Sequence, residues 1–308
     1  MQDLGREGYR SAGIGTGGAM DRVAAATANY LVGNDAGAAV IEMHFPAAEL
    51  VFNQAAVISI TGGDFSAMIN SVPVALWVPV VVSKGDCLAF KKYMDGARVY
   101  LGLQGGFQIT PWLGSNSTHT GLQMGGHQGR RLAKDDVLFF KNEQQVKPPF
   151  VTESILPYLS SIYHENNFIR CISGAEWLWL EDDSKKLFTS EVYTITPQSD
   201  RMGYRLHGAA LHITNQAPMI SSPVDAGIIQ LLPNGQMIVL MADHPTTGGY
   251  PRVAGITRAD RARLAQLAVN KPVQFELIGI ENAEEALLSM YQTLEVIKKT
   301  CSRYYDHD

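Results

Sequence analysis

The chain has 308 residues, of which 46% are hydrophobic and 18% are charged, as is usual for a globular protein and unusual for a disordered or fibrous one. Its formal net charge is −5 and its Lys and Arg residues are scattered, so we expect neither nucleic acid nor an anionic membrane as a partner. The longest apolar stretches, such as Val78–Val82, are too short to span a bilayer.

The N-terminal residues and the cysteines indicate a compartment. Met1–Arg6 includes no apolar signal segment. Cys87, Cys171 and Cys301 are far apart in the sequence, which excludes a C-x-x-C metal or redox site and fits a reducing environment. We therefore expect a cytoplasmic protein whose cysteines are small buried hydrophobes.

The first predicted element is an Ala-rich helix from about Met20 to Val32, which Gly33-Asn34 ends. Short runs rich in Val, Ile, Phe and Tyr then recur between Gly, Pro, Asn and Asp residues and predict strands. These strands are Leu50–Phe52, Ala56–Thr61, Val74–Val82, Cys87–Phe90, Arg98–Gln104 and Val137–Lys141.

Glycine-containing turns separate the predicted strands. They fall at Lys84-Gly85-Asp86, Asp95-Gly96 and Asn234-Gly235, where glycine supplies a positive φ without steric cost. Such turns favour hairpins and meanders over βαβ crossovers. A polar stretch without periodicity at Asn142–Pro157 predicts a linker, with a domain boundary near Pro149.

Two further helices are predicted in the second half. One begins at Thr257, whose hydroxyl can cap it, and ends at about Asn270. The other begins at Asn282 and keeps apolar residues at helical spacing as far as Cys301. The sequence therefore predicts a mostly β protein with a few helices (α+β), divided into lobes of residues 1–149 and 150–308, the second with the C-terminal helix.

A faint internal repeat supports two related lobes. Arg6-Glu7-Gly8-Tyr9-Arg10 is similar to Arg201-Met202-Gly203-Tyr204-Arg205, and each is followed by Thr-Gly-Gly and then by an Asp-Arg pair that opens a helix. In the second half these are Thr247-Gly248-Gly249 and Asp260-Arg261. The similarity is short, and its preserved order gives it weight.

The densest group of chemically useful residues is Met241–Arg252, a loop directly after a predicted strand. Gly248 and Gly249 permit close approach of the backbone to a ligand, and Asp243 with His244 could transfer a proton. The alternative is an ordinary tight turn whose threonine hydroxyls bond their own backbone.

Four arginines lie in segments with Gly and Tyr: Arg6, Arg10, Arg201 and Arg205. Their guanidinium groups could hold a carboxylate or phosphate in a bidentate manner, which predicts a small anionic substrate. The alternative is that they form structural salt bridges beside turns.

Two further loops could bind a ligand. Leu113–His119 is rich in hydroxyls, and Gly125–Arg131 is rich in glycine, so their backbone amides could surround an anion. The alternative is a pair of flexible loops. The sequence has no G-x-x-x-x-G-K-[ST] segment, so a P-loop is excluded.

Other catalytic arrangements find no support. Ser115 lacks the G-x-S-x-G frame of a nucleophile elbow, and the eight histidines show no metal-binding spacing. We therefore predict no metal site and no evident nucleophile in this chain, and leave a loosely held Mg²⁺ open.

A series of motifs runs in order along almost the whole chain: Gln2-Asp3-Leu4-Gly5-Arg6, Gly18-Ala19-Met20-Asp21, Ala28–Asn34, Thr61-Gly62-Gly63, Gly105-Gly106-Phe107, Gly114-Ser115-x-Ser117-Thr118, Ser199–Leu206 and Asp243-x-x-Thr246-Thr247-Gly248-Gly249-Tyr250. In this order they resemble the allophanate hydrolase subunit 2 family. That family includes the C subunit of 5-oxoprolinase, KipA-type antagonists of a histidine-kinase inhibitor, and one half of the carboxyltransferase region of urea carboxylase.

The resemblance implies a fold, a reaction and partners. The expected fold is two cyclophilin-like β-barrel lobes. The expected function is that of the C subunit of an ATP-dependent 5-oxoprolinase, a hydrolase of a cyclic amide; the subunit is inactive alone and helps convert 5-oxoproline to glutamate. Its expected partners are a KipI-like B subunit (allophanate hydrolase subunit 1), a LamB/YcsF-like A subunit and a small carboxylate substrate. ATP and Mg²⁺ are expected at the level of the complex, with no cofactor tightly bound in this chain.

Two alternatives stay open within the family. One is a KipA-type regulatory protein, and the other is the carboxyltransferase half of a urea carboxylase or allophanate hydrolase system. Pro46-Ala47-Ala48 and Met237 depart from the family pattern and leave open which member's substrate is used.

The predicted site lies between the lobes or at a partner interface. Asp243 and His244 are its candidate catalytic residues. Its candidate substrate-binding residues are Arg6, Asp21, Ser115, Ser117, Thr118, Arg201, Arg205, Thr247, Gly248, Gly249 and Tyr250.

Overall fold

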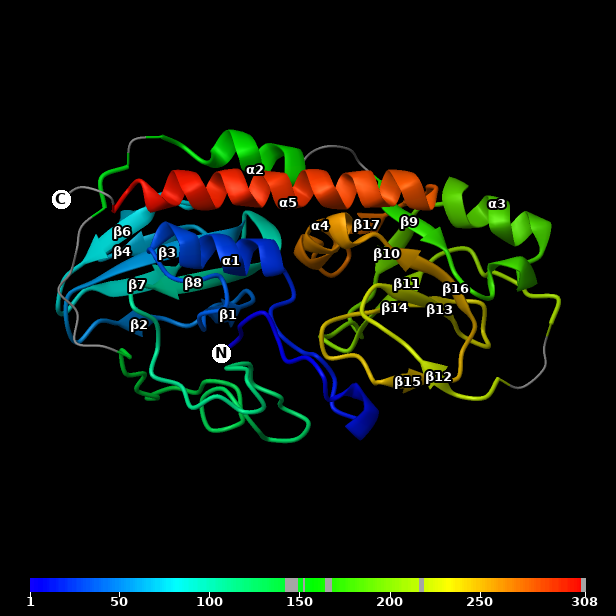
Figure 1. The fold of residues 1–308 in the computed structure, drawn as a ribbon, viewed down its shortest axis with the longest axis horizontal. Helices are drawn as coiled ribbons and strands as arrows, with labels where there is room; N and C mark the ends of the chain where they lie inside the picture. The colour runs from blue at the N-terminus through cyan, green and yellow to red at the C-terminus, as the bar shows by residue number, and fades with distance from the viewer. Residues whose placement is uncertain (142–148, 152, 164–167, 216–218, 306–308) are drawn as a thin grey trace. The chain divides into compact units, whose positions relative to one another are not determined.

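The computed structural model describes residues 1–141, 149–151, 153–163, 168–215 and 219–305. Contacts divide the chain into two compact units, both built largely of antiparallel strands (Figure 1). Unit 1 comprises Met1–Arg6, Gly17–Ser161 and Gln292–Asp308, and unit 2 comprises Glu7–Thr16 and Ile162–Tyr291.

Unit 1 contains two four-stranded antiparallel sheets, in the orders β1-β8-β3-β6 and β2-β7-β4-β5. The strands are β1 (Ile41–Met43), β2 (Leu50–Val51), β3 (Ala56–Asp64), β4 (Ala67–Ile69), β5 (Val72–Pro73), β6 (Pro79–Val82), β7 (Cys87–Phe90) and β8 (Asp95–Leu103). Residues of both sheets form one hydrophobic core, because alternate side chains of a strand point to the same face. In β3, Ile58 and Ile60 belong to this core.

Helix α1 (Arg22–Leu31) packs closely against β3 and β8, as Figure 1 shows. Small residues on both sides allow this approach. The hydroxyls of Ser59 and Thr61 donate to the carbonyl oxygens of Ala28 and Ala24, at 2.6 and 2.8 Å. A Cβ atom at Gly102 would lie 2.7 Å from the carbonyl oxygen of Ala28, so only glycine fits there.

Unit 2 contains an eight-stranded sheet in the order β17-β10-β11-β14-β13-β16-β9-β18, together with a two-stranded ribbon of β12 and β15. The strands are β9 (Ile169–Ser173), β10 (Tyr193–Ile195), β11 (Gly203–His207), β12 (Ser222–Pro223), β13 (Ile228–Leu231), β14 (Met237–Leu240), β15 (Thr247–Gly248), β16 (Arg252–Ile256), β17 (Pro272–Val273) and β18 (Phe275–Leu277).

This sheet is nearly closed into a barrel. Strands β17 and β18 are separated only by Gln274, and they pair with β10 and β9, so one short segment joins both ends of the sheet. The pairing of β18 with β9 is parallel. Phe275 is buried, and its ring stacks on Phe188 at 5.1 Å and packs against Tyr193 at 5.9 Å between ring centroids.

The remaining helical elements are η1 (Arg10–Ala12), α2 (Leu156–Tyr163), η2 (Trp177–Trp179), α3 (Asp182–Ser190), η3 (Arg258–Asp260), α4 (Arg261–Gln266) and α5 (Ile280–Ser302). The residues after α5 join unit 1. The carbonyl oxygen of Tyr304 accepts a hydrogen bond from the amide of Phe150 at 3.0 Å, and the Tyr305 hydroxyl donates to the carbonyl oxygen of Leu31 at 2.8 Å.

The predicted fold class, mostly β with a few helices and barrel-like sheets, is confirmed. Some element predictions were wrong. In the predicted strand Val74–Val82, only Pro79–Val82 is extended and paired, because Trp77 has a positive φ of 61°. Val137–Lys141 forms no strand; within it, Phe140 makes an isolated bridge to Phe107.

Helix and turn positions also differ from prediction. The helix expected from Thr257 to Asn270 begins as η3 and ends at Gln266, the Thr257 side chain makes no capping bond, and Asn270 has a left-handed φ of 66°. The helix expected from Asn282 begins two residues earlier, at Ile280.

Two of the three expected turns are present, and the third is not a turn. Asp95-Gly96 starts β8 beside an irregularity in its pairing with β3, whereas Gly85 and Gly235 occupy turns as predicted. Part of the predicted linker, residues 142–148 and 152, lies outside the described residues.

Candidate functional site

In unit 2, the loop that follows β14 is tied to the turn that precedes β11. The amide of Asp243 donates to the carbonyl oxygen of Arg201 at 2.8 Å, and that of Met241 donates to Met202 at 3.0 Å. Strands β11 and β14 are neighbours in the sheet, so the two loops meet at the same edge. The loop predicted to be the richest in chemistry is therefore held by backbone hydrogen bonds at its start.

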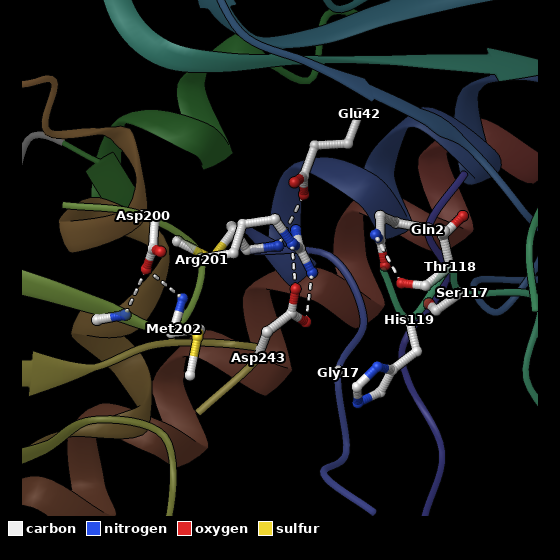
Figure 2. A network of polar contacts seen from close by, with 12 residues as sticks. Gln2, Gly17, Glu42, Ser117, Thr118, His119, Asp200, Arg201, Met202 and Asp243 are labelled. Atoms are coloured by element: carbon white, nitrogen blue, oxygen red, sulfur yellow. Dashed lines mark hydrogen bonds and ion pairs between the residues drawn. The ribbon is translucent and has the colours of Figure 1, made fainter. Parts of the chain in front are cut away.

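The side chains of Arg201 and Asp243 form a bidentate ion pair, drawn in Figure 2. The guanidinium Nε lies 2.7 Å from Oδ2, and Nη2 lies 2.9 Å from Oδ1. The side chains are 24% and 16% exposed, so the pair is partly accessible. Because both carboxylate oxygens accept from the guanidinium, Asp243 orients Arg201 in this arrangement. A role for Asp243 in proton transfer stays a prediction.

Asp200 shapes the turn that presents Arg201. Its Oδ1 accepts from the amides of Met202 at 2.8 Å and Gly203 at 3.1 Å, as Figure 2 shows. An aspartate that bonds the amide two residues ahead forms an Asx turn. The sequence analysis did not select Asp200 as a site residue, although Asp followed two residues later by Met-Gly is compatible with such a turn.

His244 is the next residue of the same loop, and its side chain is 1% exposed. Its Nδ1 is 2.6 Å from the carbonyl oxygen of Pro245, and its Nε2 is 3.6 Å from Oδ1 of Asp225. Arg10 reaches the same carboxylate at 3.8 Å and also donates to the carbonyl oxygen of Val224. His244, Asp225 and Arg10 thus lie near one another in unit 2 without hydrogen bonds between their side chains, and His244 Nε2 is a buried atom with no hydrogen-bond partner among the described residues.

The surroundings of Asp225 keep its carboxyl group ionised. His244 holds the pKa of Asp225 well below its ordinary value, and the backbone amide of Ala226 and the charges of Arg261 and Arg10 act in the same direction. Partial burial opposes these effects but does not cancel them. The sequence analysis did not identify Asp225, because no motif surrounds it and its partners are distant in the sequence.

The Thr-Gly-Gly-Tyr segment continues from this loop. Thr247 and Gly248 form β15 and pair with β12. Gln230, which is 4% exposed, donates from its side-chain amide to the carbonyl oxygen of Tyr250 at 3.3 Å. A Cβ atom at Gly248 would lie 2.5 Å from this amide, whereas one at Gly249 would have no contact closer than 3.4 Å. Gln230 is a second positioning residue that the sequence analysis missed.

The predicted binding residues of unit 2 differ in exposure. Thr247 and Tyr250 are exposed on the loop, Gly248 and Gly249 are half-buried, and Arg205 is exposed in β11, two residues after Gly203. No contact joins Arg205 to the ion pair among the described residues. The structure thus places Arg201, Asp243, His244 and the Thr247–Tyr250 segment on adjoining loops, with Arg205 apart from them on the strand.

In unit 1, Ser115 and Ser117 are completely buried and bonded to Asp3. Their hydroxyls donate to Oδ1 of Asp3 at 2.7 and 2.6 Å, and the Asp3 amide donates to the Ser117 hydroxyl at 2.8 Å. These bonds fix the loop against the N-terminal segment. The geometry gives both hydroxyls a structural role, and their assignment as substrate ligands stays a prediction.

Arg6 and Thr118 belong to the same cluster. The guanidinium of Arg6, which is 2% exposed, donates to the carbonyl oxygen of Ser117 at 2.6 Å and lies 4.7 Å from the ring centroid of Trp112. The Thr118 hydroxyl lies 3.4 Å from the N-terminal amine, and Gln2 donates to the Thr118 carbonyl oxygen at 3.5 Å (Figure 2). Four of the predicted binding residues are therefore brought together here, but all are buried.

Asp21, also in unit 1, caps helix α1. Its Oδ1 accepts from the amide of Ala24 at 2.9 Å, and its own amide donates to the hydroxyl of Tyr100 at 2.8 Å. The Tyr100 hydroxyl donates to Glu42 at 2.9 Å, and burial, with the charges of Glu42 and Asp21, raises the pKa of Tyr100 well above its ordinary value. Since Asp21 is fully buried, this geometry supports a helix cap rather than a ligand contact.

The described residues contain neither a metal-ligand cluster nor a membrane-spanning helix. No group of three or more His, Cys, Asp or Glu side chains is arranged there to hold a metal ion. Within the same ranges, every helix is too short or too polar to cross a membrane.

The fold and these motifs place the chain in a family. A family model described as carboxyltransferase domain, subdomain A and B, matches residues 12–277, and the chain belongs to this family. It is homologous to the C subunit of 5-oxoprolinase. The protein of that name from Escherichia coli K12 is 34% identical over 287 residues, which are 93% of this chain and 90% of that protein. The one from Haemophilus influenzae is 33% identical over 92% of this chain and 89% of its own length.

The urea amidolyases are also related. The Saccharomyces cerevisiae urea amidolyase is 28% identical over 99% of this chain, which spans 17% of that protein. The crystal structure of the Kluyveromyces lactis urea amidolyase superposes on 96% of this chain with a TM-score of 0.88 and 25% identity. The matched region is 19% of the urea amidolyase chain. The resemblance found in the sequence motifs is thus confirmed.

Proposed function

We propose that this chain is the C subunit of an ATP-dependent 5-oxoprolinase, a hydrolase that opens the cyclic amide of 5-oxoproline to give glutamate. The observation that carries the proposal is 34% and 33% identity to proteins named as this subunit of 5-oxoprolinase, along about nine-tenths of both chains. Such a role implies partners. We propose a KipI-like B subunit and a LamB/YcsF-like A subunit, with the chain inactive when alone.

The accessible charges of unit 2 support a role with a small carboxylate. Arg201 is held by Asp243, and exposed Thr247 and Tyr250 follow on the same loop. We propose that this edge of the sheet neutralises the substrate carboxylate or an acyl phosphate, and that loop amides stabilise developing negative charge. Fixed donors of this kind cost no reorganisation during reaction.

In this proposal, ATP and Mg²⁺ are required by the whole complex and are not bound tightly by this chain. The sequence of this chain has no P-loop, and the described residues offer no cluster of three carboxylates, histidines or cysteines for a metal.

Reconstitution tests the proposal directly. The three purified subunits, incubated with ATP, Mg²⁺ and 5-oxoproline, are expected to release glutamate, and omission of this chain is expected to abolish the release. Glutamate is measured by an enzyme-coupled assay, and the chain alone serves as the inactive control. Undiminished glutamate release without this chain would refute the assignment.

A second candidate is favoured by one observation, the match of almost the whole chain to urea amidolyase. On this alternative the chain is half of a biotin-dependent carboxyltransferase. Transfer of a carboxyl group from carboxybiotin to urea by the chain and its partner, measured with labelled bicarbonate, would support it. Glutamate release without any biotin-carrying protein supports the first proposal instead.

A further inference from the structure

Gly249 directly follows the ribbon of β12 and β15, two strands that Figure 1 shows side by side in unit 2. A Cβ atom at Gly249 would have two neighbours within 4 Å among the described residues, apart from the adjacent ones in the chain. They are the hydroxyl oxygen of Ser221 at 3.4 Å and the carbonyl oxygen of Met219 at 3.7 Å. Neither oxygen bonds to another described residue, so both are available to a ligand.

The fold itself does not require glycine at position 249. The φ angle of Gly249 lies outside the left-handed region, and its Cβ position has no contact closer than 3.4 Å. Gly248 differs, because a Cβ atom there would lie 2.5 Å from the side-chain amide of Gln230. The missing side chain at Gly249 thus leaves space beside the two oxygens that packing does not use.

We infer that this position binds a cyclic amide. The Ser221 hydroxyl donates to the amide carbonyl, and the carbonyl oxygen of Met219 accepts from the amide N–H. In a five-membered ring the amide is cis, so its N–H and C=O point away from the same edge, whereas a trans amide presents them on opposite sides. The inference rests on the proposed function, because it assigns the ring amide of 5-oxoproline to this position.

The same two atoms disfavour an anion. A carboxylate offers only acceptor atoms, and at this position it would meet the carbonyl oxygen of Met219, which is also an acceptor. A hydroxyl such as that of Ser221 can donate, so the pair matches a neutral group with one donor and one acceptor. The guanidinium of Arg201 has only donors and suits the carboxylate. The amide and the acid of 5-oxoproline are therefore recognised by different chemistry.

Contacts on both sides hold Gly249 in place. Before it, Gly248 pairs with Ser222 in the ribbon and packs against the side chain of Gln230. After it, the carbonyl oxygen of Tyr250 accepts a hydrogen bond at 3.3 Å from the same Gln230 side chain, which is 4% exposed. A site that is fixed before binding loses less free energy when its ligand is ordered.

The first test needs no enzymatic activity. 2-Pyrrolidone, which is the ring of 5-oxoproline without its carboxylate, is titrated into the isotope-labelled full chain and followed by NMR. We expect the amide signals of Gly249 and Ser221 to shift, with a dissociation constant on the order of 10 mM for so small a probe. N-methyl-2-pyrrolidone and cyclopentanone keep the ring carbonyl but have no N–H donor, so both are expected to bind at least about threefold more weakly.

Variants of Ser221 test the hydroxyl donor. Ser221→Ala is expected to weaken binding of 2-pyrrolidone about three- to tenfold, the effect of one neutral hydrogen bond, and Ser221→Thr, which keeps a hydroxyl, to retain most of the affinity. Ser190→Ala, at an exposed position of α3 in the same unit, is the matched control and is expected to change neither binding nor stability. In the reconstituted assembly, Ser221→Ala is expected to raise KM for 5-oxoproline by a similar factor with little change in kcat.

Three outcomes overturn the inference: a Gly249 signal that does not respond to 2-pyrrolidone, equal affinity for 2-pyrrolidone and its N-methyl derivative, or an affinity for 2-pyrrolidone that Ser221→Ala leaves unchanged. If the wild-type assembly releases no glutamate, the proposed function fails, while the titrations still decide whether this position binds a cyclic amide. If glutamate is released and the titrations give any of the three outcomes, only the inference is lost.

Discussion

Adjacent glycines in the 247–250 segment have different surroundings. A Cβ atom at Gly248 would lie 2.5 Å from the buried side-chain amide of Gln230, whereas one at Gly249 would lie 3.4 Å from the Ser221 hydroxyl, an ordinary contact. The first glycine is therefore required by packing. The second leaves room for a small side chain.

Substitution of the two glycines should separate stability from activity. We expect Gly248→Ala to lower the free energy of unfolding by about 1–3 kcal/mol through overpacking, and Gly249→Ala to change it by less than about 0.5 kcal/mol. Gly249→Val is expected to abolish activity of the assembly with little change in thermal stability, because its side chain occupies the loop surface. Urea unfolding and glutamate release check both. Equal destabilisation by Gly248→Ala and Gly249→Ala would contradict the packing argument.

For single residues of the candidate site, the sequence indicated which side chains could do chemistry, but not which residues they bond to. Arg201 and Asp243 were both selected, yet nothing local predicts that they pair across 42 positions. Ser115 and Ser117 were selected for their hydroxyls. Both hydroxyls donate hydrogen bonds to the carboxylate of Asp3, which is more than 110 positions away. Long-range hydrogen bonds decide which polar side chains face solvent, and periodicity does not report them.

Helix α1 depends on its N-cap. Asp21 accepts from the amide of Ala24 and is fully buried, so its carboxylate satisfies one of the free amides of the first turn. We expect Asp21→Ala to lower the free energy of unfolding by about 1–2 kcal/mol.

Asp21→Asn distinguishes a cap from a charged ligand contact, since Asn caps almost as well as Asp. This variant is expected to retain most of the stability and most of the glutamate release of the assembly. Full stability combined with lost activity would show that the charge of Asp21 serves the substrate instead. Urea unfolding and the coupled assay supply both readings.

Elements with strong local signals were predicted well, and those set by packing were not. The Ala-rich helix within Met20–Val32 and the strand Cys87–Phe90 are present as expected. Helix α3 was missed because its sequence is mainly polar and only Ser184 and Phe188 are buried. Helix α2 was missed because Pro157 was assigned to a linker, although proline is tolerated in the first turn of a helix.

Neither of the two units is a single continuous stretch of the sequence. Glu7–Thr16 belongs to unit 2, where Arg10 contacts Asp225, and the residues from Gln292 onward belong to unit 1. Composition alone marks a polar stretch and thus suggested a boundary near Pro149, but it does not report contacts between distant segments. Independent lobes of residues 1–149 and 150–308 stay a prediction, as does a site shared between lobes or with a partner.

The function of the whole molecule is most directly tested through the Arg201–Asp243 pair in the complete assembly. Glutamate release is measured with this chain either wild-type or Arg201→Gln, and with Arg252→Gln as the control. Arg252 makes the same type of bidentate pair with Glu176 in unit 2, and it is not one of the predicted catalytic or substrate-binding residues. The account predicts that Arg201→Gln lowers the rate at least about tenfold more than Arg252→Gln at similar thermal stability. Equal rates for the two variants would contradict it.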